Sequence, residues 1–288
     1  MRAAIFGGVL ASLALVLAAT ATGSPSEPAQ SGSCAKANLN LVKDGQLSLA
    51  TDNPAFPPWW GGAAKKPWEV SNPASGKGYE SAVAYAVAKQ LGFTKAQVSW
   101  SAVPFSNSFR PGKKPFDFYM AQVSFRKERA KNVSFSNSYY YVNQAVVANA
   151  STPITRVGTV AGLRPYKLGA QVGTTSYDYI ENIIRPSQSA AVYDTNNDAI
   201  AALNAGQIDG IVVDLPTAFF VVAVQLDDGE IVGKLPQRGA REQFGMVFEK
   251  GNSLVRCVNR ALNRLWANGT MKRLQRTYLA KAGAPDLR

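Results

Sequence analysis

The chain has 288 residues, of which 46% are hydrophobic and 17% are charged, and its 31 Lys and Arg against 19 Asp and Glu give a formal net charge of +12. This length allows two lobes with cores of their own, and the hydrophobic content is that of a globular protein. The chain has no histidine, which excludes His-based catalytic triads, His metal sites and His general bases. No Walker loop, Gly-x-Gly-x-x-Gly or Cys-x-x-Cys occurs, so we expect no cofactor and no metal.

The positive charge is spread along the chain, except for one dense patch from Arg126 to Lys131. A nucleic-acid-binding surface requires basic residues clustered in a stripe with aromatic residues among them. We therefore expect no nucleic-acid partner, and we interpret the charge as the basic surface of an exported protein.

The N-terminus has the pattern of a secretion signal. Arg2 precedes an apolar run over residues 3–19, and Ala19-Thr20-Ala21 offers a cleavage site. We expect a signal peptide over 1–21 and a flexible tether over 22–37, and hence an exported protein that is periplasmic, extracellular or held at the cell surface. A retained membrane anchor stays open, because the run is close to the minimum spanning length.

The two cysteines fit export. Cys34 and Cys257 are an even pair in a chain bound for an oxidising compartment, which predicts a disulfide between them. This bond would tie the mature N-terminus to a C-terminal helix. The alternative is a lipid anchor on Cys34, although residues 31–33 make a poor lipobox.

Strands and helices alternate along the rest of the chain, which predicts an α/β protein with mainly parallel sheets. Apolar alternation and short apolar runs predict strands over 47–51, 98–103, 116–123, 144–148, 167–172, 190–193, 210–213, 230–232 and 244–248. Amphipathic spacing and capping residues predict helices over 79–91, 176–184, 197–205, 216–224, 253–267 and 270–279. Residues 104–115 contain Pro111 and Gly112, and we expect an irregular segment there.

The segment 116–140 is the most informative part of the sequence. A buried-strand pattern is followed by Ser124, then by a basic helical turn over 127–131 that carries Arg129. Open α/β sheets bind ligands at the carboxyl ends of their strands. Arg129 is therefore a candidate for bidentate binding of a small carboxylate, with Ser124 as a further donor.

This segment closely resembles the family-3 extracytoplasmic solute-binding proteins of amino-acid ABC transporters, which have the type II periplasmic-binding-protein fold. Those proteins have the run Asp-(apolar)-Gly-(apolar)-Thr-x-(Thr/Ser)-x-Glu-Arg, followed by (Asp/Ser)-Phe-Ser-x-x-Tyr-Tyr. The matching residues here are Asp117, Ser124, Glu128, Arg129, Phe135, Ser136, Tyr139 and Tyr140. The resemblance implies two lobes with a ligand cleft between them: lobe 1 over 38–148 and 241–288, and lobe 2 over 149–240.

Two further strand ends offer groups for a zwitterionic ligand. The turn with Thr174 and Thr175 precedes a helix, whose N-terminal N–H groups would bind a carboxylate. Asp214 would bind an ammonium group, and Asp214-Leu215-Pro216 matches the motif that has this role in the family. Each of these residues could instead be a simple helix cap.

The ligand side chain would meet a second group of residues. In glutamine- and basic-amino-acid-binding relatives, an Asp after the first strand touches the ligand side chain, and Asp52 is in that position. Phe56 and Tyr79 could sandwich the aliphatic part of the ligand, or could simply pack within the lobe. Gln122 stands where the family usually has Gly, and would place an amide in the pocket.

The expected function is therefore extracytoplasmic binding of a polar L-amino acid, glutamine-like or basic, and its delivery to an ABC transporter permease. We expect a monomer, not an enzyme. The alternative is a cyclohexadienyl or arogenate dehydratase-like enzyme on the same fold. A second enzymatic interpretation starts from Ser124-Phe125-Arg126-Lys127, which matches the Ser-x-x-Lys of acyl-serine enzymes, but no Lys-Thr-Gly accompanies it.

Overall fold

The structure is a computed structural model that describes residue 1 and residues 34–237, 239–279 and 284–288. The expected signal peptide and most of the expected tether lie outside these residues. Within the described part of the chain, no helix combines the length and the apolar character that crossing a membrane requires.

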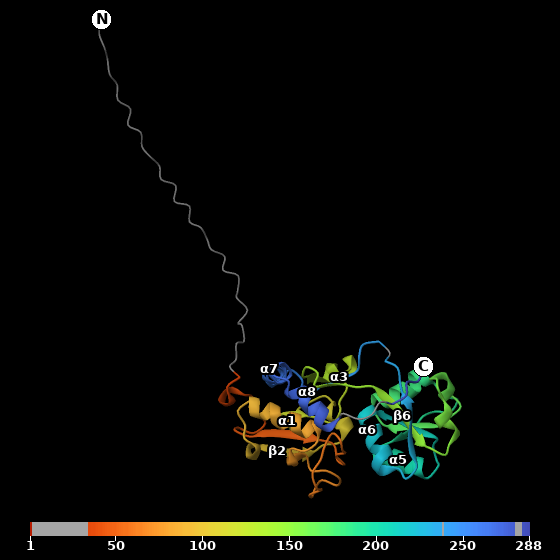
Figure 1. The fold of residues 1–288 in the computed structure, drawn as a ribbon. Helices are drawn as coiled ribbons and strands as arrows, with labels where there is room; N and C mark the ends of the chain where they lie inside the picture. Colours follow the sequence, from red (N-terminus) through yellow and green to blue (C-terminus); the bar gives the residue numbers. More distant parts are fainter. Residues whose placement is uncertain (2–33, 238, 280–283) are drawn as a thin grey trace. The chain divides into compact units, whose positions relative to one another are not determined.

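Two five-stranded sheets organise the chain from Cys34 onwards (Figure 1). The strand order of the first sheet is β2-β1-β3-β12-β4, and that of the second is β10-β6-β9-β7-β8. We call the part built on the first sheet lobe 1 and the part built on the second sheet lobe 2. A small two-stranded sheet of β5 and β11 accompanies them.

The strands agree closely with the apolar runs of the sequence. The strands of the first sheet are β1 (Leu47–Thr51), β2 (Val98–Ala102), β3 (Phe118–Tyr119), β4 (Val133–Phe135) and β12 (Val247–Glu249). Those of the second are β6 (Gln144–Asn149), β7 (Leu168–Gln171), β8 (Ala191–Tyr193), β9 (Gly210–Asp214) and β10 (Gly229–Lys234). The small sheet pairs β5 (Tyr140–Tyr141) with β11 (Gln243–Phe244).

Most helices begin and end near the expected residues, but a short helix over 105–108 lies in the segment 104–115 that was expected to be irregular. Those of lobe 1 are α1 (Tyr79–Gln90), α2 (Phe105–Ser108), α3 (Lys127–Asn132), α7 (Leu254–Ala267) and α8 (Thr270–Tyr278). Those of lobe 2 are α4 (Thr175–Tyr179), α5 (Asn196–Asn204) and α6 (Leu215–Phe220). α4 and α6 continue into π-helical turns, Ile180–Ile184 and Val221–Gln225.

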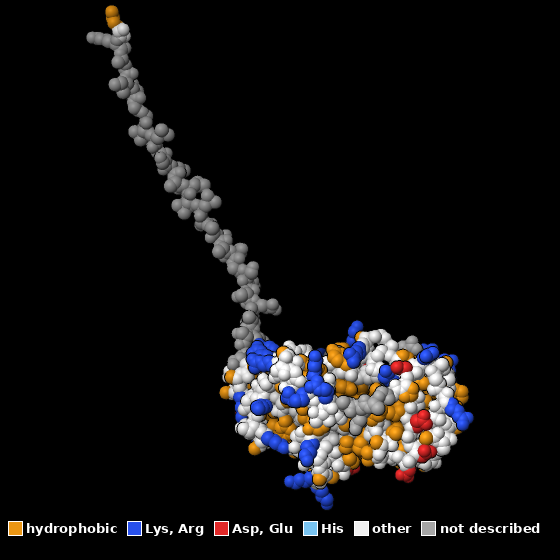
Figure 2. Space-filling view, in the orientation of Figure 1, with side chains coloured by type: hydrophobic (Ala, Val, Ile, Leu, Met, Phe, Trp, Pro, Cys, Tyr) orange, Lys and Arg blue, Asp and Glu red, His pale blue; other side chains and the backbone are white. Residues whose placement is uncertain are grey.

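α7 illustrates how the sequence sets the packing. Its buried residues are Leu254, Cys257, Val258, Ala261, Leu262 and Leu265, a spacing that forms one stripe on a helix. Its exposed face carries arginines instead. Figure 2 shows many Lys and Arg side chains over lobe 1, whereas the visible Asp and Glu side chains lie mostly on lobe 2.

Each lobe has its own apolar core. In lobe 1, the largest cluster packs α1, α7 and α8 against one face of the first sheet, around Trp59, Tyr79 and Phe248. In lobe 2, separate clusters lie around Val146 and around Val147, which point to opposite faces of β6. Helices therefore cover both faces of the second sheet, and the fold class is confirmed as a two-lobed α/β architecture.

The strand pairing is more mixed than we expected. β1 is parallel to β2 and β3, and β7 is parallel to β8 and β9, but β12 and β6 are antiparallel to their neighbours. β12 and β6 are the strands by which the chain enters a sheet after crossing from the other lobe. The expected strand 116–123 also pairs in the first sheet only over β3.

Two segments lie in a different lobe from the one the sequence suggested. The strand β6 was expected in lobe 1, but it pairs with β10 and β9 in the second sheet, so the chain changes sheet before Gln144. The C-terminal residues also lie against lobe 2, where Leu287 packs in a core cluster and its N–H donates to the carbonyl of Lys234.

The structure joins Cys34 to Cys257 in a disulfide, at a sequence separation of 223. Cys257 is buried on α7 against the lobe 1 core. The bond therefore fixes the first described residues to the last helices of the chain, and encloses nearly all of both lobes in one covalent loop.

We expect that replacing both cysteines by serine lowers the free energy of unfolding by about 2–4 kcal/mol, because the unfolded chain regains the freedom of a long loop. Urea unfolding of the variant and of the parent protein measures this difference. A reducing agent should lower the stability of the parent to that of the variant and leave the variant unchanged. Equal stability of all four samples would contradict the prediction.

Candidate functional site

A cavity of about 70 Å³ lies where strand ends and helix starts of the two lobes meet. The cavity is lined by Asp52, Pro54, Phe56, Trp60, Phe105, Ala121, Gln122, Ser124, Arg129, Gln171, Thr174, Thr175, Ser176, Thr195, Asn196, Val213, Asp214 and Thr217. Eight of the nine expected ligand-binding residues are thus brought together, and Tyr79 is the exception.

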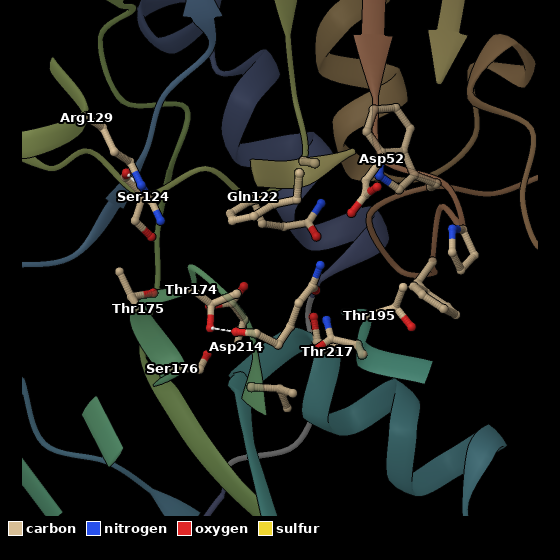
Figure 3. A pocket seen from close by; sticks show the side chains of 18 residues that line it. Asp52, Gln122, Ser124, Arg129, Thr174, Thr175, Ser176, Thr195, Asp214 and Thr217 are labelled. Carbon is tan, nitrogen blue, oxygen red and sulfur yellow. Dashed lines mark hydrogen bonds between the residues drawn. The ribbon is translucent and has the colours of Figure 1, made fainter. Parts of the chain in front are cut away.

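Arg129 and Ser124 form one end of the cavity (Figure 3). The guanidinium of Arg129 is buried and lies 4.6 Å from the ring centre of Phe109 and 5.6 Å from that of Phe105. It donates to the carbonyl of Ser124 and to the carbonyl of Gly173, each at 2.7 Å. Burial lowers the pKa of Arg129 to about 10, so it remains a cation at neutral pH.

Asp214 ends β9 and contributes a carboxylate to the cavity from lobe 2. Its Oδ1 accepts a hydrogen bond of 2.7 Å from Nε2 of Gln144, a buried residue that begins β6. Burial, followed by the nearby charge of Glu242, raises the pKa of Asp214 well above its usual range. A cationic group placed beside Asp214 would therefore favour its ionised form.

The Ser124 hydroxyl is already used within the protein. It donates to Oε1 of Glu242 at 2.5 Å, and Oε2 of Glu242 accepts a bond of 3.2 Å from the same Gln144 amide that binds Asp214. Ser124 was expected to donate its hydroxyl proton to a ligand carboxylate, so that role would require the bond to Glu242 to break.

Asp52 lies at the other end of the cavity from Arg129 (Figure 3). The N–H of Asn53 donates to Asp52, and the side chain of Gln171 also hydrogen-bonds to it. Burial raises the pKa of Asp52 to about 6 despite these bonds. Thr195 and Asn196, at the start of α5, line the cavity as well, so this end is polar on both lobes.

Gln122 lines the cavity in a left-handed backbone conformation, with φ of 51°. Such a conformation favours glycine, which the family usually has at this position. The buried carboxylate of Glu80 holds Gln122 there, because it accepts a bond of 2.8 Å from the backbone N–H and another from the side-chain amide. The Tyr139 hydroxyl is the third donor to Glu80.

Tyr79 does not reach the cavity, so the expected sandwich with Phe56 does not form. Its ring is fully buried in the lobe 1 core, and its hydroxyl donates to the carbonyl of Tyr139 at 2.6 Å. The reason is its position in the first turn of α1, which faces the core. Phe56 is half-buried and lines the cavity with Trp60.

The hydroxyl of Thr174 caps α4, since it accepts from the N–H of Tyr177 at 3.1 Å and donates to the carbonyl of Gln171. Thr175 follows it in the first turn of this helix. This turn therefore caps α4 and also lines the cavity, so the two alternatives for these residues do not exclude each other.

Several cavity residues were missed in the sequence. Gln171 ends β7, and Thr195, Asn196 and Thr217 come shortly after β8 and β9, so the rule that found Asp214 could have found them too. Gln144 and Glu242 had no such signal, because one starts a strand and the other lies in the second crossing between the lobes. In the part of the chain that the structure describes, no group of three or more acidic or Cys side chains could hold a metal ion.

The profile of the family described as bacterial extracellular solute-binding proteins, family 3, matches residues 61–281. The chain therefore belongs to this family. It is 28% identical over 205 residues to the ABC transporter arginine-binding protein 1 of Escherichia coli (strain K12), covering 68% of this chain and 79% of that protein. It is 23% identical over 285 residues to the ABC transporter glutamine-binding protein GlnH of Bacillus subtilis (strain 168), covering 96% and 97%.

Solved structures agree on the fold. An ancestral arginine-binding protein bound to glutamine superposes with a TM-score of 0.68 at 24% identity, covering 83% of this chain and all of that one. A substrate-binding protein of an ABC uptake transporter from Streptococcus pneumoniae, with bound histidine, gives a TM-score of 0.66 at 24% identity, covering 84% and 96%.

We expect Glu80 to make the stability of this protein depend on pH. Burial raises the pKa of Glu80 from 4.5 to about 7, so the folded protein takes up a proton that the unfolded chain has lost. The contribution of Glu80 is therefore present below about pH 4.5 and is lost as pH rises through 7, a fall of about 3 kcal/mol in the free energy of unfolding.

Glu80→Gln should remove this dependence, so that its stability relative to the parent protein improves by about 3 kcal/mol between pH 4.5 and pH 8. Urea unfolding across this range measures it. Glu230→Gln is the matched control, since Glu230 is exposed, and it should follow the parent. Parallel curves for the parent and Glu80→Gln would show that folding does not raise the pKa of Glu80.

Proposed function

We propose that this protein binds a polar L-amino acid outside the cytoplasm and delivers it to the permease of an ABC transporter. The observation that carries the proposal is a guanidinium and a carboxyl group in one small cavity, Arg129 from lobe 1 and Asp214 from lobe 2. Arg129 binds the ligand carboxylate, helped by the N–H groups of the Thr174–Ser176 turn, and Asp214 binds the ammonium group. The relatives are named as binding proteins of such transporters.

We further propose that the ligand side chain is basic, with glutamine as the second candidate. Asp52 lies at the opposite end of the cavity from Arg129, which supports a role in binding the ligand side chain, and Gln171, Thr195 and Asn196 line the cavity with it. Phe56 and Trp60 supply apolar surface for an aliphatic stem. Similar proteins are named for arginine and for glutamine, so both ligands belong in the test.

The proposed mechanism is closure of two lobes around the ligand, a hinge-type population shift. Several side-chain bonds already join the lobes, among them Arg129 to Gly173, Trp59 to Thr217 at 2.9 Å, and the ion pair of Arg126 with Asp178 at 2.8 Å. Lobe boundaries before Gln144 and near 240, export by the signal over 1–21 and a monomeric state are part of this proposal.

A second candidate is a dehydratase acting on a cyclic carboxylate. One structural neighbour, at a TM-score of 0.66 and 23% identity, is an ancestral amino acid-binding protein described as a precursor of cyclohexadienyl dehydratase. In that reaction Asp52, whose pKa is raised to about 6 by burial, would serve as the acid. Turnover of prephenate or arogenate without amino-acid binding would favour this function.

Isothermal titration calorimetry against the twenty L-amino acids tests the proposal on the whole mature protein. Binding of L-arginine or another polar amino acid at micromolar affinity or better is the expected result. The D-enantiomer is the control, because its side chain and ammonium group exchange places. No binding tighter than about millimolar for any amino acid would sink the proposal.

Arg129→Ala should weaken binding by about 2–5 kcal/mol, roughly thirty-fold to several thousand-fold, because the buried ligand carboxylate loses its charged partner. Calorimetry with L-arginine measures the loss. Arg110→Ala removes an exposed arginine of the same lobe and should bind normally. If Arg129→Ala also binds normally, the carboxylate is held elsewhere.

Asp52→Asn should change which ligand binds best. We expect the preference for L-arginine over L-glutamine to fall roughly tenfold, because a charge-assisted hydrogen bond becomes a neutral one. In the parent protein, L-arginine binding should weaken below about pH 6, where Asp52 takes up a proton, and L-glutamine binding should change less. Asp44→Asn, at an exposed site, is the control. An unchanged ratio of affinities would exclude Asp52 from the side-chain site.

A further inference from the structure

Two carboxylates share one amide beside the cavity. Nε2 of Gln144 donates to Asp214 at 2.7 Å and to Glu242 at 3.2 Å, and Oε1 of Gln144 accepts from the Ser176 hydroxyl at 2.6 Å. The bond from Ser176 fixes the orientation of the amide, because it identifies Oε1 as the acceptor. Asp214 and Glu242 thus each accept a hydrogen bond from the same NH2 group, that of the uncharged Gln144 amide.

Glu242 lies in the second crossing between the lobes and is fixed there by its backbone. Its N–H donates to Oε1 of Gln237 at 3.1 Å, and its carbonyl accepts from the N–H of Val142 in the first crossing at 3.2 Å. Its side chain reaches Ser124 of lobe 1 and Gln144 of lobe 2. This one residue therefore connects both crossings and both lobes to Asp214.

The groups around the pair do not neutralise it. Glu80, Tyr139 and Tyr140 act electrostatically on Asp214 or are acted on by it, and all three are neutral or negative. Around Glu242 stand Arg126, Asp178 and Arg241 in a neighbouring cavity, with Arg129 close by, and Arg126 is paired with Asp178. Among the described residues, neither Asp214 nor Glu242 has a cation within salt-bridge distance.

We propose that Glu242 is a positioning residue for the ligand ammonium group: held close to Asp214 by the Gln144 amide that both carboxylates share, its charge makes Asp214 hold a proton in the empty protein, and the arriving ammonium group displaces that proton to solvent. This inference rests on the proposed function, since it assigns a further residue to the same ligand. Ligand capture is thereby linked to proton release, through a residue that is part of the crossing between the lobes.

Asp214 holds a proton because two carboxylates lie close together in a poorly solvated environment. Burial and the charge of Glu242 both raise the pKa of Asp214, so the pair prefers to carry one negative charge rather than two. An ammonium group beside Asp214 reverses this preference, because two carboxylates and one cation together leave a single negative charge. As pH falls through the raised pKa, the ligand must compete with the proton, and its affinity decreases.

Calorimetry with L-arginine in two buffers of different ionisation enthalpy, from pH 5 to pH 8, counts the protons released on binding. The parent protein should release a fraction of a proton that decreases toward pH 8. Glu242→Gln should release fewer protons at each pH, move the midpoint of the affinity curve to lower pH by about one unit, and bind about tenfold more weakly at pH 8. Glu242→Asp keeps the charge and should restore the proton release.

Glu230→Gln is the matched control and should behave as the parent does. Binding without any change in proton release in Glu242→Gln would overturn this inference and leave the proposed function standing.

If the parent bound no amino acid, the proposed function would fail. The electrostatic coupling of Asp214 and Glu242 would still be tested by urea unfolding of the parent, Asp214→Asn, Glu242→Gln and the double variant at pH 8. Coupling predicts that the double variant gains less stability than the two single variants together, and strict additivity would overturn it.

Discussion

The arrangement of the site depends on the buried guanidinium of Arg129. A buried cation needs its donors satisfied, and Arg129 meets this need with the carbonyl of Ser124 in its own lobe and that of Gly173 in the other. Phe105 and Phe109, from a segment with little regular structure, cover its faces. Because these partners come from three separate parts of the chain, keeping the charge of Arg129 buried also holds the strand ends of the two lobes together.

Carboxyl groups outnumber the Arg129 guanidinium at the cavity, and this excess favours a ligand with a net positive charge. Asp52 and Asp214 line the cavity, Glu80 lies behind Gln122, and Glu242 lies behind Gln144, so four carboxyl groups surround one guanidinium. Burial raises the pKa of three of them, which means that negative charge in the empty site is disfavoured. A ligand with one carboxylate and two cationic groups removes most of that cost, whereas a neutral side chain leaves Asp52 without compensation.

The sequence was sufficient for the elements and for most of the cavity, because both follow from local patterns. The strands β1 and β7 and the helix α7 have the expected extents, and the polar residues directly after strands, such as Asp52 and Asp214, meet in one cavity. Sheet membership was harder to predict, since an apolar run such as β6 does not encode its partners. Glu242 also had no local signal, because its role comes from two crossings that lie far apart in the chain.

Gln122 shows how a departure from the family pattern can affect several parts of the site. Its left-handed conformation is costly for a residue with a side chain, by roughly 1–3 kcal/mol, and two hydrogen bonds to Glu80 offset this cost. Glu80 can make them only by being buried beneath the cavity, where its own pKa rises to about 7. Its charge in turn helps to raise the pKa of Asp214 in the other lobe. An amide in the place of a glycine thus contributes, through one buried acid, to the electrostatics of the group proposed to bind the ligand ammonium.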